Sequence, residues 1–261
     1  MGKNNDLDMG NWQESCKDII TDSLWIINER NKGWKHSNFY HWNFIPQIPN
    51  QLIQRYTKKW DYVLDMFIGS WTTAIECENL WRHIIGVDIQ EELIKRIDDM
   101  IDWPIKKKFI VWDSTKEEVV KNIWWFLKKN WREDLDLVLL HPPYFDIVKF
   151  SNKKEDLSNT DSLEHFLDMF KRVLENSKKL LKKWWYVWIV IGDKYQNSEW
   201  IPLWFLCMQK AQEVWLKLKS IIVKNMEWNR GKMWVWWIWR YRALNADYYI
   251  FKHEYILVFK N

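Results

Sequence analysis

The chain has 261 residues, a formal net charge of +4 and a hydrophobic content of 48%, enough apolar material for one large domain with a packed core. No apolar run approaches the ~18 residues that a membrane-spanning helix needs, and the polar start MGKNNDLDMG lacks the apolar segment of a signal peptide. The three cysteines lie far apart, so we expect no disulfide framework and no metal site, and we predict a cytoplasmic protein with no membrane partner.

Apolar runs alternate with helical patterns along most of the chain, and this alternation indicates an α/β fold with a parallel sheet covered on both faces. A short apolar stretch of helical character comes first, at 19–27. Strands are expected at 62–66, 83–88, 109–112, 135–140, 186–191 and 218–223, and helices at 50–56, 72–80, 91–100, 161–183 and 199–214. The aromatic and β-branched run 248–259 predicts a closing antiparallel strand, whereas 224–246 has no clear period.

Tryptophan is abnormally frequent and glycine abnormally rare, with 23 Trp and 7 Gly, where about 18 Gly are usual at ~7%. Several tryptophans stand where glycine is expected. Trp81 and the pair Trp184 and Trp185 follow expected helices, at the place of a left-handed C-cap residue. Trp131 follows Asn130, as glycine does in the favoured turn pair.

These positions suggest that the gene encodes glycine with UGA and that the chain was translated with UGA read as tryptophan. A β-carbon in the left-handed conformation costs roughly 1–2 kcal/mol, and an indole adds steric bulk. Trp25 and Trp200 lie in settings where tryptophan is plausible and need not be affected. The alternative is a correctly translated, tryptophan-rich protein, including one whose site has decayed.

The first chemical motif is DMFIGSWTTAIE at residues 65–76, which joins an expected strand to an expected helix. Its loop amides and helix start would hold the polar end of a cofactor, and Asp88, which ends the next strand, would accept hydrogen bonds from ribose hydroxyls. A nicotinamide dinucleotide site fits this spacing as well, and so does a purely structural strand–turn–helix. Such a loop needs glycine at its tightest position, which is occupied by Trp71.

The second motif is LLHPPYF at residues 139–145, directly after a buried strand. Two prolines stiffen the loop and fix the direction of its carbonyl groups, and Tyr144 offers an aromatic face. A base flipped out of a duplex needs these features, namely acceptors for its exocyclic amine and a ring to stack on. The alternative is a proline turn that closes a strand, with Tyr144 in the core.

Together and in this order, the two motifs resemble those of the amino-group DNA methyltransferases, which methylate adenine N6 or cytosine N4 with S-adenosylmethionine. Their cofactor loop reads D-P-F-x-G-S-G-T-T, and here it reads DMFIGSWTT; their catalytic motif reads D/N/S-P-P-Y/F/W, and here it reads HPPY. Phe44-Ile-Pro46 resembles an F-x-x-P-like segment of the family, and HEYILVF at 253–259 a common final strand. The resemblance implies a Rossmann-like methyltransferase domain at 38–261, preceded by an extension at 1–37.

The resemblance also implies a role for each matching residue. His141, Pro142, Pro143 and Tyr144 would form the catalytic motif that holds the target base, without a metal. Cofactor contacts would come from Phe44, Pro46, Asp65, Phe67, Gly69, Ser70, Trp71, Thr72, Asp88, Ile89 and Asp113. Two departures stand out. Trp71 replaces a loop glycine and should obstruct the cofactor. His141 replaces Asp, Asn or Ser; a neutral imidazole can still accept one hydrogen bond, but the change removes the usual guide to adenine or cytosine.

The short interval between the two motifs leaves no room for a separate target-recognition domain. We therefore expect recognition by small insertions around 145–160 and 224–246, where basic side chains would contact phosphates or guanine edges: Lys149, Lys153, Arg230, Lys232, Arg240 and Arg242. A solvated basic surface is the alternative for each.

The predicted function is site-specific methylation of double-stranded DNA, with adenine N6 favoured. Cytosine N4, an RNA base amine or an inactive nucleic-acid-binding relative are the alternatives, and a restriction endonuclease is a candidate partner.

Overall fold

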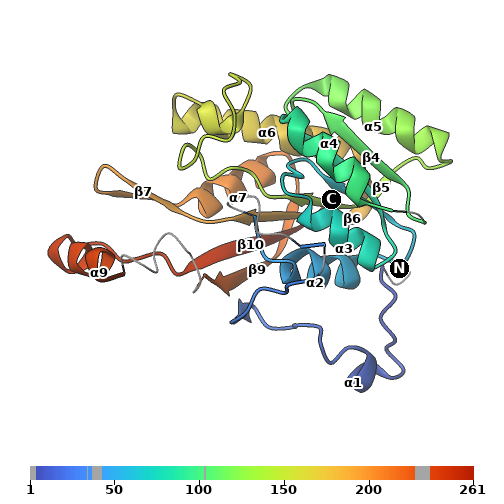
Figure 1. Ribbon diagram of the computed structural model, residues 1–261, viewed down its shortest axis with the longest axis horizontal. Coiled ribbons are helices and arrows are strands. Elements are labelled where there is room, and N and C mark those ends of the chain that lie inside the picture. The colour runs from blue at the N-terminus through green and yellow to red at the C-terminus, as the bar shows by residue number, and fades with distance from the viewer. Residues whose placement is uncertain (1–3, 34, 37–42, 103, 227–235) are drawn as a thin grey trace.

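The computed structural model describes residues 4–33, 35–36, 43–102, 104–226 and 236–261. One sheet contains eight strands: β1 (Leu24–Trp25), β2 (Tyr62–Asp65), β3 (His83–Asp88), β4 (Lys107–Val111), β5 (Leu135–Leu140), β6 (Leu181–Ile191), β9 (Lys217–Asn225) and β10 (His253–Lys260). Their order is β1-β9-β10-β6-β5-β2-β3-β4 (Figure 1). β10 runs antiparallel to its neighbours β6 and β9, and the other pairings are parallel. The predicted sheet and its antiparallel closing strand are confirmed.

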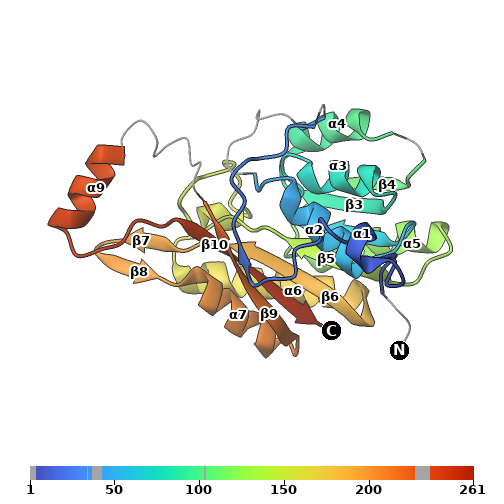
Figure 2. The ribbon, with the colours of Figure 1, turned by 90° about the horizontal axis from the view of Figure 1, so that it is seen from below.

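Helices cover both faces of this sheet. α2 (Gln47–Tyr56), α3 (Thr72–Asn79) and α4 (Glu91–Met100) form one layer, and α5 (Glu117–Lys129), α6 (Leu163–Leu180) and α7 (Leu203–Glu213) form the other (Figure 2). Because successive strand residues point to opposite faces, β5 divides its side chains between two cores. Val138 and Leu140 pack with the α5–α7 layer, whereas Leu137 and Leu139 pack with the α2–α4 layer. The nearly all-apolar strand is thus explained by burial on both faces.

The longest helix, α6, has the expected apolar stripe, with Phe166, Phe170 and Val173 fully buried. Its N-cap is Ser162, whose hydroxyl accepts the His165 backbone N–H at 3.1 Å. The helix ends at Leu180, earlier than the predicted residue 183, because Leu181 already pairs with Leu135 in the sheet. Pairing with β5 outweighs the helical pattern of the lysine-rich segment that follows.

Three other sequence predictions were wrong in detail. The predicted helix at 199–214 begins only at Leu203, because 194–201 form a hairpin of β7 (Lys194–Gln196) and β8 (Glu199–Ile201). Its two turn residues, Asn197 and Ser198, both have positive φ, as the tight hairpin turn requires. The stretch 19–27 contains the short strand β1 rather than a helix, and the closing strand begins at residue 253 rather than 248. Two short helical turns, α1 (Trp12–Ser15) and η1 (Leu157–Asn159), complete the early and middle segments.

A helix was missed in the segment without clear period, α9 (Trp236–Asn245). It projects away from the sheet on the same side as the β7–β8 hairpin in both views (Figures 1 and 2). Large apolar side chains on it are exposed, among them Trp237, Tyr241 and Leu244. With aromatic residues on several sides, α9 lacks the single apolar stripe by which a helix is recognised in a sequence. No helix in the described parts of the chain is long and apolar enough to cross a membrane.

Six tryptophans adopt the left-handed conformation. In the described residues, nine non-glycine residues have positive φ, and six of them are Trp60, Trp71, Trp81, Trp131, Trp184 and Trp215, with φ between 58° and 71°. Four of the five tryptophans singled out from the sequence are in this set.

The fifth predicted tryptophan, Trp185, does not have positive φ. For Trp184 the positive φ was predicted, but the predicted reason, a position at the end of a helix, was wrong. Trp184 lies in an irregular part of β6, where the register with β5 shifts, rather than at a helix end. Such bulges often need a residue at positive φ. Trp60 and Trp215 were missed, although Trp215 directly follows the C-cap of α7, as Trp81 follows that of α3.

Candidate functional site

The carboxyl ends of four neighbouring strands bring the main predicted site residues to one edge of the sheet. β5, β2, β3 and β4 are adjacent, and Asp65, Asp88, Asp113 and His141 lie at their ends or within two residues after them. This edge is where open parallel sheets bind their ligands. The two sequence motifs therefore meet in space because β5 pairs directly with β2.

Asp65 organises the loop that follows β2. Its buried carboxylate accepts the backbone N–H of Phe67 at 2.9 Å and the hydroxyl of Thr73 at 2.6 Å. Thr72 begins α3, and both Thr72 and Ser70, which belongs to the loop, are buried. The acidic side chain thus ties the end of the strand to the first turn of the helix and fixes the path of the loop between them.

Asp88 joins the loop to the next strand. One carboxylate oxygen accepts the Gly69 N–H at 2.9 Å and the other accepts the Gln90 N–H at 2.8 Å. Gly69 itself has positive φ, which a glycine adopts without strain. Asp113, on the far side of β3, accepts the Thr115 N–H at 2.8 Å. Each strand end is thus closed by an aspartate that caps the following turn.

Trp71 interrupts this loop. It is the N-cap residue of α3, with φ of 60°, and its side chain is only 5% exposed, within the core cluster that also contains Phe44. A glycine here would adopt the same backbone conformation without strain and without filling the space beside the loop. The backbone therefore has the shape of a cofactor loop, while the side chain occupies buried volume that such a loop leaves open.

Burial raises the pKa of Asp65 to about 7 and that of Asp88 to about 6, both above the ordinary aspartate value. The folded protein therefore binds more protons than the unfolded chain from about pH 4 to pH 7, so the free energy of unfolding falls as pH rises through this range. Burial raises the pKa of Asp61 to about 6 as well, so it adds to the same decline.

Replacing Asp65 with Asn should weaken this pH dependence. The amide oxygen can still accept the Phe67 N–H, but the side chain no longer ionises in a buried site. We expect urea unfolding at pH 8 to show a gain of up to a few kcal/mol over the parent, and little change at pH 4. Asp134→Asn, which alters an exposed carboxyl, is the control. An equal pH dependence in the parent and in Asp65→Asn would contradict the assignment.

The HPPY motif is held by residues at or directly after three other strands. The Tyr144 hydroxyl donates to Glu254 at 3.0 Å, and Glu254 also pairs with Lys224 at 2.8 Å. Gly192, which follows β6, lies under the ring; a β-carbon there would be 2.7 Å from Tyr144 Cε2. Burial, followed by the charge of Glu254, keeps the pKa of the Tyr144 hydroxyl well above its usual range.

His141, the first residue of the HPPY motif, contacts both Tyr144 and Phe44. Its Nε2 is 3.3 Å from the Tyr144 hydroxyl, and its ring centroid is 4.8 Å from that of Phe44. Burial lowers the pKa of His141 to about 4, so the imidazole is neutral at physiological pH. Pro142 is buried and Pro143 is partly buried. Phe44, two residues before the α2 N-cap Pro46, thus contacts the HPPY motif.

The residues predicted to contact nucleic acid lie in different settings. Lys149 is exposed, whereas the Lys153 ammonium donates to the carbonyl of Ile89 at 2.6 Å, beside the expected ribose and adenine contacts. Arg240 and Arg242 are exposed on α9, and the Arg242 guanidinium lies over the Trp239 ring, 5.6 Å from its centroid. Arg230 and Lys232 lie outside the described residues.

Three residues around Tyr144 were not predicted from the sequence: Gly192, Lys224 and Glu254. Lys224 was expected in an irregular insertion but belongs to β9, where it is buried. Glu254 offered a signal, because it is a carboxylate near the start of an otherwise apolar strand. Buried charges are rare unless paired, so its position indicates a charged or polar partner.

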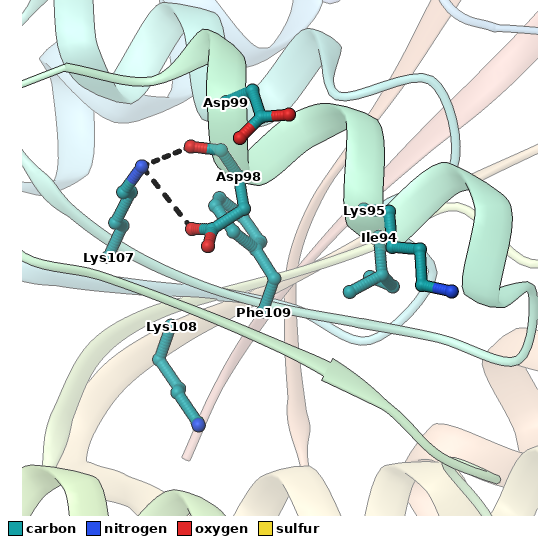
Figure 3. A pocket seen from close by; sticks show the side chains of 7 residues that line it. All are labelled: Ile94, Lys95, Asp98, Asp99, Lys107, Lys108 and Phe109. Atoms are coloured by element: carbon teal, nitrogen blue, oxygen red, sulfur yellow. Dashed lines mark hydrogen bonds and ion pairs between the residues drawn. The ribbon is translucent and has the colours of Figure 1, made fainter.

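A groove of about 570 Å³ lies elsewhere, between α4 and β4. It is lined by Ile94, Lys95, Asp98, Asp99, Lys107, Lys108 and Phe109, and Lys107 bonds to Asp98 across it (Figure 3). None of the site residues described above lines this groove, and its charges are mixed and partly paired.

Known proteins share the sequence pattern of this chain. Residues 3–99 and 135–261 match the profile of the N6/N4 DNA methylase family. The type II methyltransferase M2.DpnII of Streptococcus pneumoniae is 37% identical over 86 residues, and the type II methyltransferase M2.LlaDCHI of Lactococcus lactis subsp. cremoris is 36% identical over 86 residues. Each alignment covers 31% of this chain and 29% of the relative, so less than a third of either relative is matched.

Solved structures share the fold. TrmN from Thermus thermophilus has a TM-score of 0.50 at 13% identity, covering 84% of this chain and 49% of that one. The N-methyltransferase NodS from Bradyrhizobium japonicum WM9, in complex with S-adenosyl-L-homocysteine, has a TM-score of 0.50 at 8% identity, covering 82% and 86%. The fold is that of methyltransferases that use S-adenosylmethionine. Since the family profile matches most of its length, the chain belongs to the N6/N4 DNA methylase family, and its cofactor is S-adenosylmethionine.

Proposed function

We propose that the protein methylates an exocyclic base amine in double-stranded DNA, with adenine N6 as the favoured target. The observation that carries this proposal is the meeting of the two motifs, with the His141–Tyr144 loop on β5 and the Asp65 loop on the adjacent β2. A base amine held by the first would face a cofactor held by the second. The names of the two type II methyltransferases support a restriction-modification role, with an endonuclease as partner.

The residues present fit the cofactor in most respects. Asp65 and Asp88 would supply carboxylates for its ammonium group and ribose hydroxyls, Ile89 and Asp113 would lie along the adenine side, and Phe44 would provide an apolar wall. Phe67, Gly69, Ser70 and Thr72 would line the methionine part. The cofactor supplies an activated methyl group on a sulfonium. Trp71 opposes the fit, because its indole is buried beside the loop.

The protein's own part is to position the base and exclude water. Tyr144 would stack on the flipped base, and the Pro142 carbonyl and His141 would accept the two amine hydrogens. The nitrogen lone pair would then point at the methyl group that the bound cofactor supplies, and His141 or water would take the proton that the nitrogen releases on methylation. Positioning and desolvation account for most of such a rate enhancement.

α9 and the loop 145–160 would bind the DNA. α9 presents exposed aromatic rings together with Arg240 and Arg242, a combination that suits stacking on bases and contact with phosphates. Lys149 on the other segment would add a phosphate contact.

The test uses the 261-residue chain with Trp71→Gly, S-adenosylmethionine carrying a labelled methyl group, and unmethylated duplex DNA. We expect micromolar cofactor binding by calorimetry and labelled N6-methyladenine after hydrolysis of the DNA to nucleosides. N4-methylcytosine would move the target to cytosine, and labelling of RNA alone would exclude DNA as substrate. Trp71→Phe, which keeps a β-carbon and a ring, is the matched control and should bind the cofactor poorly. Absence of cofactor binding by Trp71→Gly would overturn the proposal.

A further inference from the structure

A chain of four polar side chains leads from the sheet to the catalytic histidine. Lys224 and Glu254 are direct partners in the register of β9 and β10, and their side chains form an ion pair at 2.8 Å while only 6% and 8% exposed. The other Glu254 oxygen is 3.0 Å from the Tyr144 hydroxyl, which in turn is 3.3 Å from His141 Nε2. The chain therefore runs Lys224, Glu254, Tyr144, His141.

The positions of the hydrogens along this chain follow from the charge of Glu254. A carboxylate paired with an ammonium group has only acceptor atoms, so the contact with Tyr144 requires the tyrosine to donate its single hydrogen to Glu254. The phenolic oxygen then has lone pairs but no hydrogen left for His141. The contact at 3.3 Å is a hydrogen bond only if His141 carries its hydrogen on Nε2 and donates it to the tyrosine.

We propose that Lys224 and Glu254 are positioning residues that hold His141 in the Nε2–H tautomer and leave its Nδ1 lone pair to accept a hydrogen bond from the target amine. In a neutral imidazole, one nitrogen is a donor and the other an acceptor, so fixing the first assigns the second. In the described parts of the chain, no side chain or backbone group bonds to Nδ1. The tautomer is a property of the protein alone, whereas its use by an amine rests on the proposed function.

The packing around the chain fixes its geometry. Gly192 lets the Tyr144 ring lie where a β-carbon would be 2.7 Å from Cε2, and the Phe44 ring contacts His141 with centroids 4.8 Å apart. The low pKa of His141 keeps the ring neutral, so a tautomer is well defined. The arrangement explains how histidine can stand where the family motif has Asp, Asn or Ser, all of which offer an oxygen acceptor.

Nuclear magnetic resonance of protein labelled with ¹⁵N-histidine tests the tautomer directly. Long-range proton–nitrogen correlations distinguish a protonated from an unprotonated ring nitrogen, and His141→Gln identifies the signals. We expect a protonated Nε2 and an unprotonated Nδ1 at pH 7 in the full chain without cofactor or DNA. A Nδ1–H tautomer, or an equal mixture of the two, would overturn the proposal.

Glu254→Gln should reverse the tautomer. The amide oxygen would accept from Lys224, and the amide NH₂ would donate to the Tyr144 oxygen, so the tyrosine hydrogen turns to His141 Nε2 and the imidazole hydrogen moves to Nδ1. An unchanged tautomer would contradict the chain. Tyr144→Phe provides a second test if Glu254→Gln folds poorly, because removing the hydroxyl should let both tautomers populate. Tyr255→Phe is the matched control: its hydroxyl bonds to His253 at 2.9 Å on the same strand, and His141 should not respond.

Rates of methyl transfer distinguish a failure of this proposal from a failure of the proposed function. In a Trp71→Gly background, Glu254→Gln should reduce the rate of methyl transfer at saturating cofactor and DNA about 100-fold, with the cofactor Kd unchanged. If the background protein transfers no methyl group while His141 shows the Nε2–H tautomer, the proposed function fails and the tautomer assignment stands. If the background protein is active and Glu254→Gln is equally active with a reversed tautomer, the role of Nδ1 as acceptor is overturned.

Discussion

Replacing the five exposed tryptophans at positive φ with glycine should raise the free energy of unfolding by several kcal/mol. Their exposed fractions lie between 44% and 95%, so the lost indoles contribute little burial, whereas each β-carbon costs roughly 1–2 kcal/mol in this conformation. The extra freedom of glycine in the unfolded chain offsets part of each gain. The positions are Trp60, Trp81, Trp131, Trp184 and Trp215. The contributions of Trp131, Trp184 and Trp215 should be nearly additive, whereas Trp60 and Trp81 touch each other, so their contributions should not be additive.

Urea unfolding of the single and combined variants measures this effect. Trp125→Gly is the matched control, because Trp125 is also well exposed but lies inside helix α5, where glycine is unfavourable by several tenths of a kcal/mol or more. The control should therefore change stability in the opposite direction. Destabilisation at most of the five positions, similar to that in the control, would show that the indoles are native to these sites.

The five exposed positions and Trp71, all tryptophans at positive φ, bear on the genetic code of the organism. If UGA encodes glycine, the codons for Trp71 and the five exposed tryptophans are UGA, while that for the buried, strand-forming Trp25 can be UGG. UGG at the six positive-φ sites would leave a tryptophan-rich protein under backbone strain. Sequencing the coding DNA distinguishes the two hypotheses independently of any property of the folded chain.

The layers of the fold were predictable because the decisive signals are local. The β5 segment is apolar at nearly every position, which only a strand buried on both faces requires, and strand and helix patterns alternate around it. The ends of helices and strands were less predictable where a segment can either continue a helix or pair with a neighbouring strand. The segment after Leu180 continues a helical pattern, yet Leu181 pairs with Leu135, and no property of the segment alone reveals that partner.

The candidate site also contains some residues that were predictable from the sequence and others that were not. Asp65 and Asp88 were predictable because each directly ends a strand, and parallel strands place such residues at one edge. The pairing of Glu254 with Lys224 was not, because it depends on β10 running antiparallel between β6 and β9. That placement brings residues from the end of the chain beside the Pro-Pro loop. The α9 helix escaped prediction for another reason, namely the lack of one apolar face.

Tyr144→Ala should lower the rate of methyl transfer by about 100-fold or more while leaving the cofactor Kd within about threefold. Stacking of a base on an aromatic ring is worth about 1–3 kcal/mol, and loss of the ring also removes the hydroxyl that bonds to Glu254 and His141. The acidic cofactor residues belong to the ends of other strands, β2 and β3, so cofactor affinity should persist.

Measurements in the Trp71→Gly background separate an effect on the rate of methyl transfer from an effect on cofactor affinity. Asp88→Ala is the reciprocal variant: it removes the carboxylate that holds the Gly69 amide and should raise the cofactor Kd, with methyl transfer recovering at saturating cofactor. Tyr144→Phe keeps the stacking face and should fall between the parent and Tyr144→Ala. Equal losses of cofactor binding and methyl transfer in Tyr144→Ala would contradict base stacking, because a residue that contacts only the target base affects the transition state without changing the affinity for the other substrate.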